Sequence, residues 1–265
     1  MGNTQRLNGK VAIVTGGGVG IGEAIALAFA AEGAEVVIAA RALPRLEAVA
    51  EKIRSQGGKA IAMQIDVSDE EQVKQMVART LDEYGRVDIL VNNSGIAGPT
   101  VKLVDLELAG WNETLAIDLT GTMLCSREAL KNMVERQCGN IINISSVAGT
   151  IGVAMRTPYC AAKWGVIGFT QALAKEVHKN NIRVNCIAPG MVEGERMVNV
   201  FTARAEAEGM TYDDVVAKDT AAVRARMGDV FLSADEIAGT AVFLASDESS
   251  GVTGRTLTVD KGAFL

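Results

Sequence analysis

The sequence predicts an α/β fold of the doubly wound, Rossmann-like type, in which one parallel sheet of seven strands carries helices on both faces. Short apolar, β-branched runs alternate with helical patterns along most of the 265 residues. This alternation is typical of right-handed βαβ crossovers, which build parallel sheets. The apolar runs are continuous rather than alternating, as expected for strands that are buried on both faces of a sheet.

The expected strands are short runs rich in Val and Ile. They are Val11–Thr15, Glu35–Ala39, Ala60–Ile65, Val87–Val91, Asn140–Ile144, Arg183–Ile187 and Thr256–Val259. The expected helices repeat apolar residues at intervals of three and four positions. They are Glu23–Glu32, Leu43–Ser55, Glu70–Tyr84, Gly110–Gln137, Pro158–Lys179 and Ala234–Ala245. We expect Gly33 to end the first helix and Asp69 to cap the third.

We expect one domain over residues 1–265, because no repeat, low-complexity segment or linker divides the chain. The segment 191–228 interrupts the alternation, since it is long, charged and only partly helical. Segments of this kind are usually functional, and we expect this one to form a lid over the substrate. Apolar lid residues can line the substrate site or simply pack the lid against the body. The candidates are Met191, Val192, Met197, Val200 and Phe201, with Arg196 and Arg204 as possible anion contacts.

Composition excludes several classes of protein. The net charge of −6 argues against nucleic-acid binding, which requires clustered Lys and Arg. No apolar run reaches the ~18 residues of a membrane span, and the first ten residues lack the apolar core of a signal peptide. The four cysteines show no CxxC spacing, which favours free thiols in a reducing cytoplasm. His178 is the only histidine, so we expect no metal site.

A glycine-rich turn follows the first expected strand. Such a turn before a helix places bare backbone N–H groups at a positive helix end, which favours a phosphate-bearing ligand. Glycine is needed where a Cβ would block the approach of the backbone to a pyrophosphate. The spacing, G-x3-G-x-G, is not the G-x-G-x-x-G fingerprint, so a tight strand-to-helix connection is the alternative. The expected cofactor-binding residues here are Thr15, Gly16, Gly18, Val19, Gly20, Ile21 and Gly22.

The end of the second expected strand indicates which dinucleotide binds. Sites without a 2′-phosphate usually have Asp or Glu there, which accepts a hydrogen bond from the ribose. This chain has Ala39-Ala40-Arg41 instead. Because the guanidinium fork matches phosphate oxygens, we expect NADP as the cofactor. The alternative is NAD, with Arg41 merely solvated at a helix start.

Polar residues also close the third and fourth expected strands. Asp66 and Val67 follow the third strand, where Asp66 could accept a hydrogen bond from the adenine amino group or could instead cap a helix. Asn93, Ser94 and Gly95 follow the fourth strand. Turns at the carboxyl ends of parallel strands line the ligand crevice of open sheets, although a plain Asx turn would look similar.

A serine, a tyrosine and a lysine form the most informative set. Ser145-Ser146 closes the fifth strand, and Tyr159 and Lys163 lie on one face of the following helix. A free phenol ionises near pH ~10, so its use as a base at neutral pH requires about 4 kcal/mol. One ammonium at ~4 Å supplies that much at an effective dielectric near 20, but only ~1 kcal/mol in water. We therefore expect the pair to work in a pocket that is partly closed to water.

In order and spacing, these motifs resemble those of the single-domain short-chain dehydrogenase/reductase family over nearly the whole chain. The matching residues are Thr15, Gly16, Gly20, Gly22, Ser146, Tyr159, Lys163, Pro189 and Gly190. The resemblance implies that Tyr159 transfers a proton and that Ser146 polarises the substrate oxygen. It implies that Lys163 holds the nicotinamide ribose and favours the phenolate.

The resemblance also implies that Pro189 and Gly190 border the nicotinamide, and Val192 is a further expected cofactor-binding residue. It favours Ser146 over Ser145 as the active serine, because the family's serine directly precedes the V-x-G turn seen at Val147-Ala148-Gly149.

Four positions depart from the family pattern. Ser94 replaces an alanine in N-N-A-G, and Lys261 replaces a glycine near the C-terminus. Gly194 stands where a cofactor-contacting threonine often follows Pro-Gly. Asp118 occupies the place of the asparagine that usually completes a catalytic tetrad. Its main-chain carbonyl can still hold a relay water, and its carboxylate near Lys163 would favour the charged ammonium.

We therefore expect an NAD(P)-dependent oxidoreductase that interconverts a secondary alcohol and a ketone, or an aldehyde. A 3-oxoacyl thioester, a sugar or polyol, and an aromatic alcohol remain open as substrates. The alternatives are a nucleotide-binding regulator with little activity and an epimerase or dehydratase that uses the cofactor transiently. By resemblance we expect a homo-oligomer, a tetramer or a dimer, with the helices 110–137 and 158–179 supplying an apolar face.

Overall fold

The computed structural model describes residues 5–228 and 230–264 of the chain. Within these residues one sheet of seven strands has the order β3-β2-β1-β4-β5-β6-β7, and every neighbouring pair is parallel. The strands are β1 (Val11–Thr15), β2 (Glu35–Ala40), β3 (Lys59–Gln64), β4 (Ile89–Asn92), β5 (Gly139–Ile144), β6 (Ile182–Pro189) and β7 (Thr256–Val259). The expected doubly wound α/β fold is confirmed.

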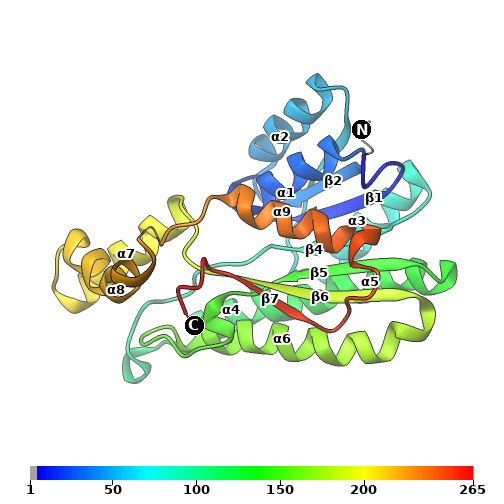
Figure 1. Cartoon of the computed structure of the whole chain (residues 1–265). Helices are drawn as coiled ribbons and strands as arrows, with labels where there is room; N and C mark the ends of the chain where they lie inside the picture. Colours follow the sequence, from blue (N-terminus) through cyan, green and yellow to red (C-terminus); the bar gives the residue numbers. More distant parts are fainter. Residues whose placement is uncertain (1–4, 229, 265) are drawn as a thin grey trace.

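Helices cover both faces of the sheet (Figure 1). One face carries α1 (Gly20–Ala31), α2 (Leu43–Ser55) and α9 (Ala234–Ala245). The other face carries α3 (Glu70–Tyr84), α5 (Gly121–Arg136) and α6 (Thr157–Val177). Among the described residues, no helix is both long enough and apolar enough to cross a membrane.

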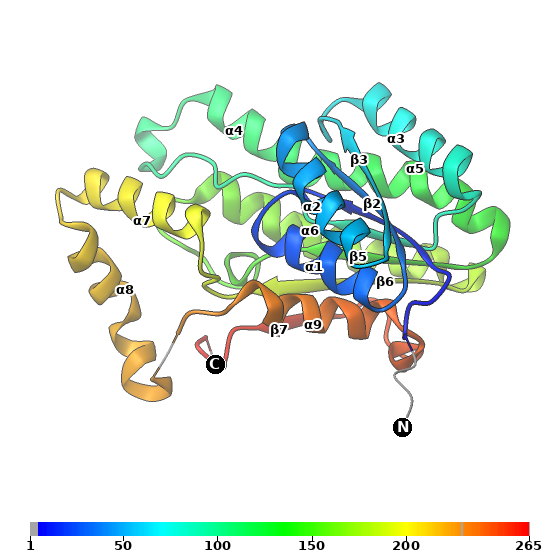
Figure 2. The same cartoon turned by 90° about the horizontal axis from the view of Figure 1, so that it is seen from above.

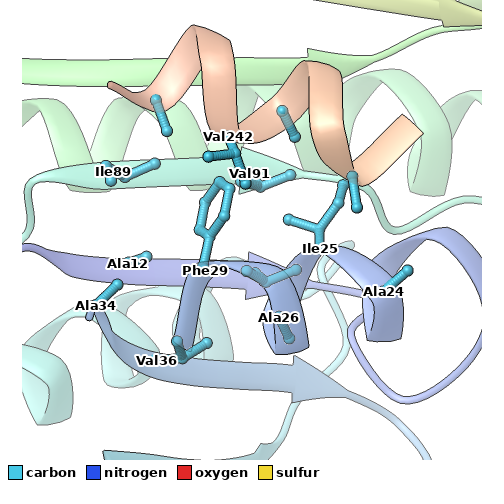
Figure 3. Packing of buried hydrophobic residues seen from close by; sticks show 14 of the residues in the cluster. Ala12, Ala24, Ile25, Ala26, Phe29, Ala34, Val36, Ile89, Val91 and Val242 are labelled. Atoms are coloured by element: carbon cyan, nitrogen blue, oxygen red, sulfur yellow. The ribbon is translucent and has the colours of Figure 1, made fainter. Parts of the chain in front are cut away.

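Alternate residues of the strands fill the two cores. In β1, Ala12 and Val14 pack beneath α1 and α9, whereas Ile13 faces the opposite helices. Phe29 of α1 is fully buried and lies with Val91 of β4 and Val242 of α9 (Figure 3). A phenylalanine side chain contributes about 1.5–3 kcal/mol when fully buried, so this contact fixes α1, and with it the glycine turn, against the sheet.

The expected signals at helix ends are confirmed. Helix α1 ends at Ala31, and Gly33 follows with a φ of +87°. The side chain of Asp69 accepts hydrogen bonds from the backbone N–H groups of Glu71 (2.9 Å) and Gln72 (3.1 Å) at the start of α3.

The expected single helix over Gly110–Gln137 is wrong in one respect, because it is interrupted. Helix α4 (Leu108–Leu115) passes into a π-helical turn, Ala116–Thr120, before α5 begins at Gly121. The extra residue of a π-turn rotates the side chains that follow, and such turns often occur at functional sites. Here the turn contains Asp118, which it directs into the interior.

The segment expected as a lid holds two helices, α7 (Glu195–Glu208) and α8 (Tyr212–Met227), which lie together at one end of the molecule (Figures 1 and 2). Phe201, Ala205 and Val215 form a small core of their own, against which Met191 and Met197 pack. Met191, Met197 and Phe201 therefore pack within the segment, and they also line a cleft at the carboxyl ends of the strands.

Candidate active site

A cleft of about 920 Å³ opens at the carboxyl ends of the strands. It lies where the strand order reverses between β1 and β4, which is where ligands bind in open α/β sheets. The turns after β1, β2, β3, β4, β5 and β6 all contribute to its walls. Of the site residues expected from the sequence, those that line it are Gly16, Gly18, Val19, Gly20, Ile21, Arg41, Asp66, Val67, Asn93, Ser94, Gly95, Ser146, Tyr159, Lys163, Pro189, Gly190 and Val192.

The glycine turn offers a cradle for an anion. Gly16 and Gly20 have φ values of +66° and +58°, which side-chain-bearing residues rarely adopt. A Cβ on Gly20 would meet no protein atom within 4 Å. No side chain caps the N-terminus of α1, where Val19 is the N-cap residue. The backbone N–H groups of this helix end therefore remain available to a phosphate, so the turn fits a dinucleotide.

Two residues expected to bind the cofactor do not line the cleft. Thr15 is 1% exposed, and its hydroxyl donates to Val91 O (3.2 Å) and accepts from the N–H groups of Asn93 (3.0 Å) and Ser94 (3.1 Å). A Cβ on Gly22 would lie 2.2 Å from Gly16 O. Both residues hold the turn in shape, because they pack β1 and α1 against the loop after β4.

Two arginines stand at the end of the cleft next to β2. Arg41 is exposed at the carboxyl end of β2 and lines the cleft. Arg45, in the first turn of α2, lines it as well, and its Nη1 lies 3.8 Å from the exposed Glu195 Oε2. Arg45 was not among the residues expected from the sequence. Its position four residues after Arg41, across a helix start, is the signal that could have found it.

Asp66 lines the cleft after β3, and its Oδ1 accepts hydrogen bonds from Ser68 N (2.9 Å) and Ser68 Oγ (2.6 Å). It closes a turn and does not cap α3, since Asp69 does that. The helix-capping alternative for Asp66 is therefore wrong.

Ser146 and Ser145 have different surroundings. Ser145 is 3% exposed, and its hydroxyl donates to Lys163 O (2.8 Å), so it joins β5 to α6. Ser146 lines the cleft, where its Oγ accepts from Ala148 N (3.1 Å). Because the oxygen of Ser146 accepts that bond, its own proton is free to be donated to an oxygen in the cleft.

Tyr159 and Lys163 stand on the face of α6 that borders the cleft. The ammonium of Lys163 lies 5.6 Å from the centre of the Tyr159 ring and donates to Ile144 O (3.2 Å). Lys163 is 3% exposed, so its charge acts through a medium that contains little water.

Asp118 is completely buried and does not line the cleft. Its Oδ1 accepts from Ile96 N (2.7 Å), and its Oδ2 lies 3.3 Å from Lys163 Nζ without forming a hydrogen bond. The expected proximity of this carboxylate to Lys163 is what the structure shows. Asp118 contacts two residues that line the cleft, Ile96 and Lys163, without lining it itself. The expected catalytic role of Asp118 stays a prediction, and it would act through these residues.

Arg156 also belongs to the site and was missed. It directly precedes α6, is 7% exposed and lines the cleft. Its guanidinium carbon lies 4.7 Å from the centre of the Tyr159 ring, and its Nη2 donates to Ala97 O (2.8 Å). Burial lowers the pKa of this guanidinium, and the nearby Tyr159 opposes that effect. A basic residue three positions before the tyrosine of Y-x3-K was the available signal.

Comparisons with known proteins decide the family. A family model described as short chain dehydrogenase matches residues 10–205. The chain belongs to the short-chain dehydrogenase/reductase family. Its members here include a 3-oxoacyl-[acyl-carrier-protein] reductase from Synechocystis sp. that is 39% identical over 261 residues, which are 98% of each chain.

Two solved structures of the family have nearly the same fold. Levodione reductase superposes with a TM-score of 0.91 at 31% identity, covering 97% of this chain and 98% of its own. A variant of actinorhodin polyketide ketoreductase, solved with NADPH, superposes with a TM-score of 0.90 at 32% identity, covering 96% and 97%. This member of the family is therefore a nicotinamide-dependent oxidoreductase that transfers hydride between an alcohol and a ketone.

Proposed function

We propose that the protein is an NADP(H)-dependent carbonyl reductase or alcohol dehydrogenase in which Tyr159 transfers the proton. The observation that carries this proposal is that Ser146, Tyr159 and Lys163 line the same cleft as the glycine turn. A bound nicotinamide would supply or accept the hydride at the carbonyl carbon.

In the direction of reduction, Ser146 donates a hydrogen bond to the carbonyl oxygen and Tyr159 gives its proton to that oxygen as the carbon receives the hydride. The phenolate then regains a proton from water. An ammonium 5.6 Å from the ring centre attracts a phenolate by about 3 kcal/mol at an effective dielectric of 20. Lys163 therefore stabilises the negative charge left on Tyr159 after the proton is transferred, and Asp118 keeps Lys163 in place.

Tyr159→Phe tests the mechanism. It removes the transferable proton and keeps the ring on which Arg156 lies. We expect kcat to fall about 10²- to 10⁴-fold, the usual contribution of a general acid or base. NADPH binding, followed by nicotinamide fluorescence, should change little. Near-normal turnover of a ketone panel by Tyr159→Phe would refute the proposed role.

The preference for NADP is supported by Arg41 and Arg45, which line the same end of the cleft. Each hydrogen bond to a charged group contributes about 1.5–3 kcal/mol. We expect Arg41→Ala to raise KM for NADP+ at least tenfold and to leave KM for NAD+ nearly unchanged, with Arg45→Ala acting in the same sense. A wild-type enzyme that prefers NAD+ would show that both arginines are merely solvated.

We propose that residues 191–228 form the lid over the substrate. Support comes from Met191, Met197 and Phe201, which line the cleft as well as packing within the segment. Arg204 also reaches the cleft, but its guanidinium pairs with Glu208 (2.7 Å) and with Asp219. Arg196, on the same helix, donates to Gly95 O across the mouth of the cleft.

We also propose that the protein works as a homo-oligomer in the cytoplasm. Large apolar side chains are exposed on and before α4 and on α6, namely Leu103, Val104, Leu108 and Trp164. Large apolar side chains exposed in this way are often covered by another subunit. Sedimentation velocity at micromolar concentration should show a dimer or tetramer, and a monomer would contradict the proposal.

A further inference from the structure

Arg156 carries a buried positive charge in the wall of the cleft. It is 7% exposed, and its Nε is buried without any hydrogen-bond partner. The only bond of its guanidinium within the described residues runs from Nη2 to Ala97 O. No carboxylate of the described residues forms an ion pair with it, although Asp118 is near enough to influence it.

The other cations in protected positions are better satisfied. Lys163 has the carboxylate of Asp118 and the carbonyl of Ile144. Arg183 is more than half buried and donates four hydrogen bonds to Leu244, Ser246, Ser249 and Val252. An unpaired buried charge costs several kcal/mol, which proteins normally avoid. A charge left unpaired beside the proton-transfer residue is therefore a specific feature of this cleft.

The backbone next to Arg156 is constrained. The preceding residue, Met155, has a φ of +64°, a left-handed conformation that is uncommon outside glycine. Its carbonyl accepts from Val101 N (3.0 Å), which joins the loop before α6 to the loop after β4. Strained residues often occur at functional sites, and Met155 directly precedes Arg156, which lines the cleft.

We propose that Arg156 binds a free carboxylate of the substrate, so that the substrate is an oxo acid and the product the corresponding hydroxy acid, or the reverse. This inference rests on the proposed function, because it places the reacting carbonyl at Tyr159. The guanidinium lies over the ring of Tyr159, so the carboxylate must be only a few bonds from the reacting carbon. An arginine fork suits a carboxylate because it can donate two parallel hydrogen bonds.

Acetoacetate and its uncharged ester, ethyl acetoacetate, are matched probes of this inference. In NADPH-oxidation assays we expect wild-type enzyme to have the higher kcat/KM for the acid. Arg156→Gln keeps a group that can donate to Ala97 O and should lower kcat/KM for acetoacetate about 10- to 100-fold, mainly through KM. The ester should be nearly unaffected, and Arg156→Lys should restore part of the preference.

Arg79→Gln is the matched control, because Arg79 is an exposed arginine of α3 that does not line the cleft. It should leave both substrates unaffected. Equal preference of wild type for acid and ester would overturn the inference, as would an equal loss for both in Arg156→Gln. An equal loss for both substrates would mean that Arg156 acts by holding Tyr159, or the loop before α6, in place. Neither outcome would contradict the proposed function, which is tested by Tyr159→Phe.

Calorimetry of the enzyme with NADP+ tests the same contact without turnover. Butyrate should bind to wild type and bind at least tenfold more weakly to Arg156→Gln. Butyramide has nearly the same shape and no charge, so its affinity should not depend on Arg156. Equal binding of butyrate and butyramide would overturn the inference even if neither acetoacetate nor its ester is reduced.

Discussion

Asp118→Asn tests how far the buried ion pair supports the active site. Asparagine has almost the same shape as aspartate and retains an oxygen that can accept the hydrogen bond from Ile96 N, which is 2.7 Å from Oδ1. The substitution therefore removes the charge and keeps the turn. What is lost is the attraction between the carboxylate and the ammonium of Lys163, 3.3 Å away.

The magnitude follows from that distance and from the burial of both partners. Two unit charges 3.3 Å apart attract by about 5 kcal/mol at an effective dielectric of 20. Removal of one partner from a buried pair usually costs about 3–5 kcal/mol. Since Lys163 keeps its hydrogen bond to Ile144 O, we expect a loss at the lower end of this range, about 3 kcal/mol of unfolding free energy. For a chain of this size the loss corresponds to a decrease in Tm of about 6 °C.

Thermal unfolding followed by circular dichroism, at one protein concentration and without cofactor, measures this effect. Glu71→Gln is the control, because it removes the carboxylate of an exposed pair with Lys74; its Tm should match wild type, as exposed pairs contribute little. A Tm of Asp118→Asn equal to or above that of wild type would refute the reasoning. It would mean that desolvation of the carboxylate cancels its attraction to Lys163.

Three further predictions concern the scaffold. Gly22→Ala should disrupt the glycine turn, because the new Cβ would lie 2.2 Å from a carbonyl oxygen, and a fluorescence titration should then show no NADPH binding. In contrast, Gly239 lies at an exposed helical position where a new Cβ would meet no atom within 4 Å. Gly239→Ala should therefore raise the free energy of unfolding by about 0.5–1 kcal/mol. A fully functional Gly22→Ala protein would contradict the packing argument. For Asp88, burial alone would raise the pKa of the carboxyl, but Arg86 and Arg136 hold it below its usual range. The ionised carboxylate should therefore stabilise the fold fully above pH ~4, the pKa of an aspartate in the unfolded chain, and this stabilisation should be lost as the pH falls toward the lower pKa of the folded protein. In urea titrations the difference in stability between wild type and Asp88→Asn should narrow below pH ~4. A difference that does not change with pH would contradict the assignment.

The sequence alone determined the fold class and most of the cleft. Strands and helices of this kind are set by local patterns of apolar residues, and a parallel sheet brings the carboxyl ends of its strands to one edge. Residues that directly follow strands, such as Gly16, Arg41 and Ser146, must therefore line the same crevice. Tyr159 and Lys163 could be paired because helical spacing places them on one face.

Only the tertiary structure decided which of these residues face the cleft and which hold it together. Thr15 and Gly22 lie within the glycine motif, yet both are used in packing against the loop after β4. The π-turn that buries Asp118 is equally invisible in a periodic pattern, since one extra residue in a helical turn leaves no local signal. Arg156 is buried against Ala97, which precedes it by 59 positions in the chain. Burial and charge pairing depend on what surrounds a side chain, and those surroundings exist only once the chain has folded.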